Sequence, residues 1–211
     1  MDLVVLLHGL WRSRWSMAWP LHRLRAAGFH AVAISYPSRS QSIDGLSRFV
    51  AARLPDPAGG HLHFVTHSLG GLVVRHLIRT TRPPWLGRVV MMAPPNQGSR
   101  LARRLARSPV MRALAGPVGP LLASAPDEIA RALGPVDFEL GVIAGDVERS
   151  VLAGWLAGPS DGRLLIPETQ VEGMADFVAV SRCHAFLMND ARAIQQTVHF
   201  LRHGSFDRSF G

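Results

Sequence analysis

Short runs of apolar and β-branched residues recur along the chain and alternate with segments whose apolar residues follow a helical period. The runs are almost continuously apolar, which is typical of strands buried on both faces of a parallel sheet. They predict strands at residues 3–7, 30–36, 62–66, 88–93, 138–145 and 176–181. The segments between them predict helices at about 16–27, 43–54, 69–80 and 191–202. This alternation predicts a doubly wound, mostly parallel α/β sheet with helices on both faces.

The length of the chain, 211 residues, fits one domain with a sizeable core. We therefore expect residues 1–211 to form a single α/β domain without internal repeats. In sheets of this kind, ligands bind at the carboxyl ends of the strands, so the chemistry is expected there.

Residues 99–135 differ from the rest of the chain because they are rich in Ala, Arg, Gly and Pro. The glycines and prolines predict short, interrupted helices. Two interpretations remain open: a crossover helix with a long connection, or a small helical cap over the active site. The segment offers more apolar side chains than one crossover helix needs, namely Leu101, Leu105, Val110, Met111, Leu114, Val118, Leu121 and Leu122.

The composition narrows the class of protein. Hydrophobic residues make up 47% of the chain and charged residues 18%, which is typical of a globular protein and not of a disordered one. The formal net charge is +8, and all 23 basic residues are arginines. They are scattered and form no stripe with aromatic residues, which argues against nucleic acid as a partner. A single cysteine, Cys183, excludes an intrachain disulfide. The N-terminal apolar run is too short for a signal peptide or a membrane span, so we expect a cytoplasmic protein.

One serine occupies an unusual position. In HLHFVTHSLGGLVVRHLI (61–78), Ser68 stands where the strand pattern changes to a helix pattern, with Gly70 and Gly71 just after it. This arrangement is typical of a nucleophile elbow, a sharp turn that exposes the serine Oγ above the sheet. Thr66 stands at the position where glycine is usual, which weakens the match.

A serine nucleophile needs N–H donors for the oxyanion that forms on its substrate. The stretch LLHGLW (6–11) places His8 and Gly9 at the end of the first predicted strand. The backbone N–H groups of Leu10 and Leu69 are therefore the candidate donors of an oxyanion hole.

With these motifs the chain resembles the α/β-hydrolase superfamily, and within it the small bacterial lipases and esterases. The resemblance extends from His8 almost to the C-terminus and includes MMAPPNQGS (91–99), which is similar to a pocket-wall segment of lipase-like members. It implies a Ser, acid, His order of catalytic residues along the chain.

The resemblance favours Asp161 as the acid, because PSDGRLLIPE (159–168) is similar to the Asp-Gly segment around the family's catalytic acid. An ordinary Asp-Gly surface turn would give the same local pattern. Other acids after Ser68 remain open as alternatives, namely Asp146, Glu148, Glu168 and Asp176.

The resemblance also favours His184 as the base, because it follows the last predicted strand and precedes the apolar AFLM (185–188). His67 is next to the serine, and we expect it to point away from the site. His8 is expected to pack or hydrogen-bond beneath the loop after the first strand.

The implied activity is hydrolysis of carboxylic esters, as by an esterase or lipase, without a metal or organic cofactor. The expected partners are a small acyl ester or a lipid, with transient contact to a lipid surface. Thioester hydrolysis or acyl transfer would use the same residues, and a catalytically silent protein that binds a ligand is the alternative from another class.

Overall fold

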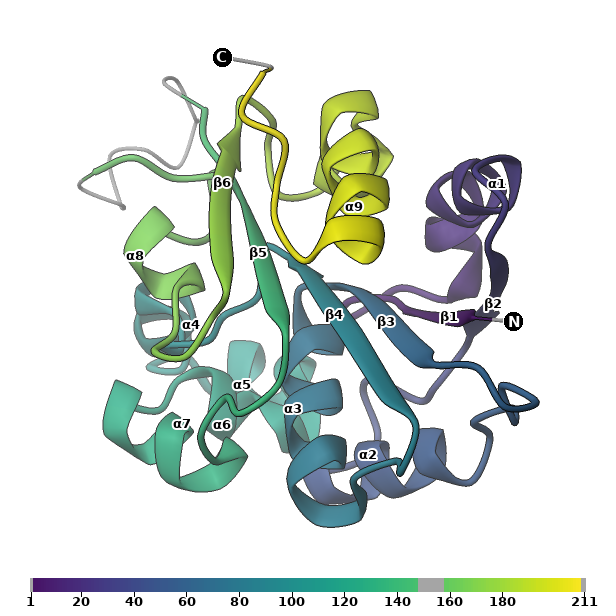
Figure 1. Ribbon diagram of the computed structural model, residues 1–211. Coiled ribbons are helices and arrows are strands. Elements are labelled where there is room, and N and C mark those ends of the chain that lie inside the picture. The colour runs from purple at the N-terminus through teal and green to yellow at the C-terminus, as the bar shows by residue number, and fades with distance from the viewer. Residues whose placement is uncertain (1, 148–157, 210–211) are drawn as a thin grey trace.

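The computed structural model describes residues 2–147 and 158–209 (Figure 1). In this part of the chain, six strands form one sheet in the order β2-β1-β3-β4-β5-β6, and every neighbouring pair is parallel. The strands are β1 (Leu3–Leu7), β2 (His30–Ile34), β3 (Leu62–His67), β4 (Leu86–Met92), β5 (Leu140–Gly145) and β6 (Asp176–Val180). The predicted parallel α/β fold is confirmed.

Both faces of the sheet are covered, which explains why the strands are apolar throughout. In β1, Leu3, Val5 and Leu7 pack into one core cluster, while Val4 and Leu6 pack into the other. Helices α2 (Ile43–Ala51) and α3 (Leu69–Thr81) cover the first face. Helices α1 (Ala18–Ala26) and α9 (Ala191–His203) cover the second face (Figure 1).

Within residues 2–147 and 158–209, the body of the domain also contains three short helices: η1 (Arg14–Met17), α8 (Ile166–Thr169) and η4 (Leu187–Asn189). The helix predicted over 16–27 therefore starts as a 3-10 turn and continues as α1. The helix predicted over 43–54 ends at Ala51, since Leu54 precedes Pro55 and such a residue disfavours helical backbone angles.

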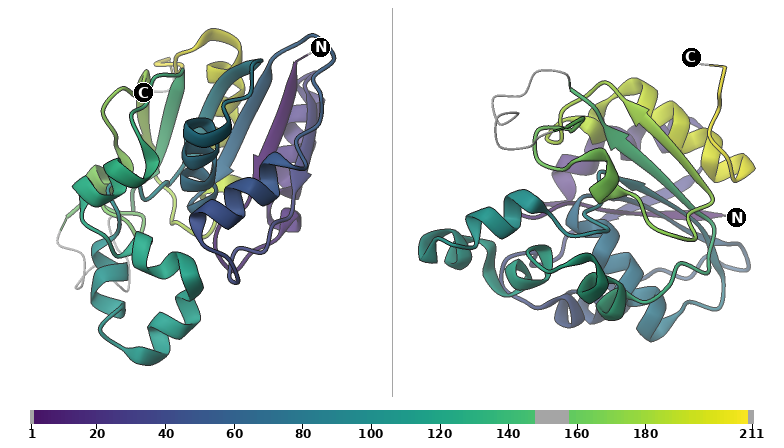
Figure 2. Two further views of the ribbon diagram at one scale, coloured as in Figure 1. Left: turned by 90° about the horizontal axis from the view of Figure 1, so that it is seen from below. Right: turned by 90° about the vertical axis from the view of Figure 1, so that its left-hand side faces the viewer.

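The segment 99–135 contains a series of short helices between β4 and β5, and it projects from the body of the sheet (Figure 2). They are α4 (Arg100–Leu105), α5 (Pro109–Ala115), η2 (Gly116–Val118), α6 (Gly119–Leu122) and α7 (Pro126–Leu133). Pro109 and Pro126 are the first residues of their helices, and Pro120 is the second residue of α6. Proline is tolerated in the first turn because the backbone N–H groups there have no acceptor within the helix. The segment joins the core through Ile129 and Leu133 of α7 and through Val118 of η2, whereas α4, α5 and α6 contain no buried residue.

Among the described residues, no helix has both the length and the apolar character needed to cross a membrane.

Candidate active site

Ser68 lies at the turn between β3 and α3, at the carboxyl edge of the sheet. The chain leaves β1 for β2 on one side and returns to β3 on the other, so Ser68 stands where the strand order reverses. Its backbone angles are φ 54° and ψ −120°, which non-glycine residues rarely adopt. Such strain persists only where the surrounding structure holds it. Here the N–H of Ser68 donates to the Met92 carbonyl at 2.9 Å.

Gly70 is what allows the helix to start so close to β1. A Cβ at this position would lie 2.8 Å from the carbonyl oxygen of Leu7, closer than backbone atoms allow. Thr66, which replaces the usual glycine of this motif, is fully buried and pairs with Leu7 and Met91 as an ordinary strand residue. The departure from the pattern is thus accommodated within the sheet.

Ser68, His184 and Asp161 form a continuous hydrogen-bonded chain. His184 Nε2 lies 3.1 Å from Ser68 Oγ, and His184 Nδ1 lies 2.7 Å from Asp161 Oδ2. Both the aspartate and the histidine are buried, whereas the serine is partly exposed. With Nδ1–H donating to the carboxylate, Nε2 is free to accept the serine proton.

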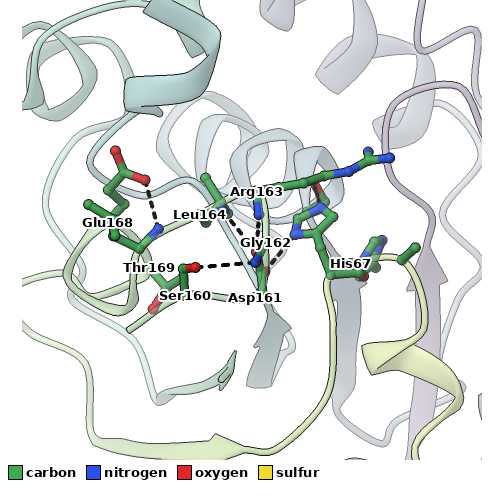
Figure 3. A network of polar contacts seen from close by, with 12 residues as sticks. His67, Ser160, Asp161, Gly162, Arg163, Leu164, Glu168 and Thr169 are labelled. Atoms are coloured by element: carbon green, nitrogen blue, oxygen red, sulfur yellow. Dashed lines mark hydrogen bonds and ion pairs between the residues drawn. The ribbon is translucent and has the colours of Figure 1, made fainter. Parts of the chain in front are cut away.

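The turn after Asp161 fixes its carboxylate. Oδ1 accepts hydrogen bonds from the backbone N–H groups of Arg163 and Leu164, each at 2.8 Å (Figure 3). Oδ2 is therefore left for His184. The backbone N–H of His184 donates to the Asp161 carbonyl at 2.9 Å, which holds the two loops together.

The other candidate acids lie in different surroundings. Glu168 is buried and accepts hydrogen bonds from the backbone N–H groups of Arg100 and Leu165, at the starts of α4 and α8. Asp176 accepts from the N–H groups of Phe177 and Phe206. Asp146 follows β5 and is partly buried, and Glu148 lies outside the described residues.

The position expected for His67 is wrong. Its ring lies beside that of His184, with centroids 5.0 Å apart, and its Nε2 is 2.9 Å from the His184 carbonyl oxygen. Alternation along β3 puts His67 on the same face as Val65, which α1 and α9 cover, and the loop carrying His184 leads into α9. This alternation is the signal that could have placed it. Burial is the main reason why the pKa of His67 is well below its ordinary value, so the ring is neutral.

The loop after β1 is held by His8, as expected. His8 Nδ1 is 2.8 Å from the Gly9 carbonyl, and Nε2 accepts the N–H of Tyr36 at 3.3 Å. The Tyr36 hydroxyl donates to the His8 carbonyl, and the two rings stack with centroids 4.2 Å apart. Burial lowers the pKa of His8, in agreement with a neutral ring that both donates and accepts.

These contacts set the direction of the next peptide group. The carbonyl of a trans peptide points away from its N–H, so fixing the Gly9 carbonyl towards His8 turns the N–H of Leu10 the other way. A Cβ at Gly9 would lie 3.2 Å from Ser68 Cβ, so this loop lies directly against the serine. In the described part of the chain, the N–H of Leu10 has no backbone acceptor. The N–H of Leu69, at the first position of α3, has none within its helix.

A cavity of about 770 Å³ opens at Ser68 and His184. Its floor includes Gly9, Leu10 and Leu69, and Pro95 and Ser99 from the 91–99 stretch also line it. Much of the rest of the wall is apolar and comes from α4, α5 and α6, including Leu101, Leu105, Met111, Leu114 and Leu122. Within the described residues, no group of three or more His, Cys, Asp or Glu side chains could hold a metal ion.

The model of the alpha/beta hydrolase family matches residues 4–205, and the chain belongs to this family. The resemblance seen in the sequence is thereby confirmed. No curated protein gives a significant sequence match.

Solved structures share the fold at low sequence identity. A Bacillus licheniformis lipase in its mature form has a TM-score of 0.69 and 16% identity, over 93% of this chain and 88% of the lipase. A metagenomic carboxyl esterase has a TM-score of 0.65 and 19% identity, over 88% of this chain and 65% of the esterase. A phospholipase from Legionella pneumophila has a TM-score of 0.66 and 17% identity, over 81% of this chain but only 44% of the phospholipase.

Proposed function

We propose that this protein is a serine hydrolase that cleaves carboxylic esters, as an esterase or lipase does. The observation that carries the proposal is the series of hydrogen bonds from Ser68 Oγ through His184 to Asp161. Ser68 and His184 both line a mainly apolar cavity. Ser68 is the nucleophile, His184 the general base and Asp161 the residue that holds the base in its reactive tautomer.

The reaction has two steps. In the first, His184 Nε2 takes the hydroxyl proton as Ser68 Oγ attacks the ester carbonyl, and the proton then passes to the departing alcohol. In the second, His184 deprotonates water, which attacks the acyl-serine and releases the carboxylic acid. Asp161 stays ionised and stabilises the positive imidazolium in both steps.

The oxyanion is proposed to accept hydrogen bonds from the N–H groups of Leu10 and Leu69. Three observations support this assignment. Among the described residues, neither N–H group has a backbone acceptor. Gly9 lies close to Ser68, and a hydrogen bond to His8 holds the Gly9 carbonyl away from the site. Because His8 and Tyr36 hold this loop before substrate arrives, little reorganisation is needed when the negative charge develops.

The segment 99–135 is proposed to be a cap that forms the acyl-binding wall. Its leucines and Met111 surround the space next to Ser68, which suits an apolar acyl chain of medium length. The names of the structural neighbours, lipase, carboxyl esterase and phospholipase, agree with an acyl ester as substrate.

The test combines covalent labelling with turnover. Wild-type protein should react with a fluorophosphonate probe and hydrolyse p-nitrophenyl esters, with the highest rates at medium chain length. Ser68→Ala should lose both properties, with turnover reduced on the order of a million-fold, while its circular dichroism spectrum is unchanged. Labelling that persists in Ser68→Ala would exclude this nucleophile. The absence of labelling in the wild type would favour a silent binding protein, and faster cleavage of matched thioesters would favour a thioesterase.

A further inference from the structure

Two arginines, Arg12 and Arg163, line the cavity together with Ser68 and His184. Arg12 follows the loop after β1, and its Nη2 donates to the carbonyl oxygen of Ala185, the residue directly after His184, at 2.9 Å. Arg163 follows Asp161 by two residues. Its side chain extends away from the Asp161 turn towards the side on which His67 lies (Figure 3). Both arginines therefore come from loops that also carry the proposed catalytic groups.

The two guanidinium groups line the same cavity, and Arg163 affects Arg12. The pKa of Arg12 is lowered, first by burial and then by the positive charge of Arg163. Both charges also contribute to the low pKa of His67, whose ring is next to that of His184. The cavity thus concentrates positive charge at its catalytic end.

The carboxylate of Asp161, two residues before Arg163, is already hydrogen-bonded to His184 and to two backbone N–H groups. Within the described residues, neither Arg12 nor Arg163 forms an ion pair with an acidic side chain, although other arginines do. The described lining of the cavity also contains Arg112 but no Asp or Glu.

The positive charges of Arg12 and Arg163 lie in the same cavity as the proposed catalytic groups. A negative group on the substrate would compensate these positive charges. It would also accept charge-assisted hydrogen bonds from the two guanidinium groups.

We propose that the natural substrate is an acyl ester whose alcohol half carries an anionic group, a carboxylate or a phosphate, held between Arg12 and Arg163. This inference rests on the proposed function of the same site. The alcohol half is assigned to the arginines because His184 must reach the departing oxygen, so the alcohol lies on the histidine side of Ser68. The acyl chain then lies against the apolar wall formed by α4, α5 and α6.

The reaction is an ordinary hydrolysis. The bond between the acyl carbon and the ester oxygen breaks, His184 gives its proton to that oxygen, and water later releases the acyl group from Ser68. The products are a carboxylic acid and an alcohol that keeps its anionic group. Water is the only co-reactant.

Three matched substrates test the inference: para-(butanoyloxy)benzoate, para-(butanoyloxy)phenyl phosphate and the neutral para-(butanoyloxy)benzamide. They share the acyl group and an aryl leaving group, and they differ mainly in charge. At low ionic strength the wild type should prefer the anionic esters in kcat/KM by about tenfold, as expected for charge-assisted hydrogen bonds at a partly exposed site. The preference should decrease as sodium chloride is added.

Arg12→Gln and Arg163→Gln should each reduce the ratio of kcat/KM for anionic over neutral esters, mostly through KM. Arg53→Gln is the charge-matched control, since Arg53 is exposed just after α2 and does not line the cavity. This variant should keep the wild-type ratio.

The outcomes separate this inference from the proposed function. Equal kcat/KM for charged and neutral esters, with hydrolysis that depends on Ser68, would overturn the inference alone. A preference that survives in both arginine variants would also overturn it. If no ester is hydrolysed in a Ser68-dependent way, the proposed function fails and the inference fails with it. A larger effect on the phosphate ester than on the benzoate would identify phosphate as the anion.

Discussion

Replacing Asp161 by asparagine changes one atom of the proposed catalytic chain, and the structure dictates how the new amide would lie. Oδ1 of Asp161 accepts two backbone hydrogen bonds, from Arg163 and Leu164, so the oxygen of the introduced amide has to stay there. The amide NH₂ group then faces His184 Nδ1, where the carboxylate oxygen now lies 2.7 Å away. An NH₂ donor at this point forces Nδ1 to become an acceptor, which places the ring proton on Nε2.

A proton on Nε2 points at Ser68 Oγ and prevents the histidine from accepting the serine proton. The same change of tautomer at other Ser-His-Asp sites reduces turnover roughly ten-thousand-fold, which corresponds to about 5 kcal/mol. A flipped amide would restore the tautomer, but it would leave two buried N–H groups without an acceptor, at about 1–3 kcal/mol each. The expected loss in kcat/KM is therefore between about thirtyfold, for the cheapest amide flip, and about ten-thousandfold, for the wrong tautomer.

The assay is hydrolysis of p-nitrophenyl butyrate by wild type, Asp161→Asn and Asp146→Asn, with thermal unfolding as the check of the fold. Asp146 lies near the same edge of the sheet but makes no hydrogen bond to His184 within the described residues. Its variant should keep activity within a few-fold. If Asp161→Asn lost less than tenfold, or if Asp146→Asn lost as much, the reasoning from the amide orientation would be wrong.

Further predictions concern the elbow, the buried histidine and the cap. Gly70→Ala should destabilise the protein by about 1–3 kcal/mol and reduce turnover, since its Cβ would meet the Leu7 carbonyl; an unchanged denaturation midpoint would contradict this. Burial lowers the pKa of His67 below 6.5, so the unfolded chain takes up a proton first as the pH falls through 6.5. The free energy of unfolding should therefore decrease below that pH, and less steeply in His67→Gln, as denaturant titrations at several pH values can check. In 99–135, amide hydrogen exchange should be faster in α4 and α5 than in α7, and the rate of ester hydrolysis should rise as the substrate passes its solubility limit. Uniform protection with a smooth saturation curve would contradict the proposed cap.

The strands can be predicted closely because each is buried on two faces and therefore apolar throughout. The run at 3–7 matches β1, and the run at 176–181 extends one residue past β6. The end of β2 is less predictable. The apolar pattern continues to Tyr36, but that residue leaves the sheet, and its ring stacks on His8. Such a contact joins residues far apart in the sequence and has no local signal.

Some residues of the candidate site can be predicted from the sequence, and others cannot. Ser68 and His184 stand at junctions of predicted elements, so their positions at the carboxyl edge follow from the topology. The sequence alone leaves several acids open, because an Asp-Gly turn is common and its carboxylate can face any direction. The proximity of Arg12 and Arg163 depends on how two loops fold over the edge, which no periodicity encodes. The prediction for His67 is wrong because it follows from the neighbouring Ser68 alone and neglects the alternation of β3.

Buried side chains are unevenly distributed between the sheet and the segment 99–135, and this distribution decides which substitutions the protein tolerates. The groups proposed for the chemistry lie on loops anchored to a buried sheet, whereas α4, α5 and α6 form much of the cavity wall and contain no buried residue. Substitutions in those three helices can therefore alter which acyl chains fit while removing little of the free energy that keeps the domain folded. The substrate range of such a molecule is open to rapid drift and to laboratory selection, since variants that bind a new chain still fold. Libraries confined to α4, α5 and α6, leaving Gly116 and Val118 of η2 unchanged, should accordingly yield many soluble proteins with shifted chain-length profiles, whereas equally large libraries in β3 should yield mostly insoluble ones.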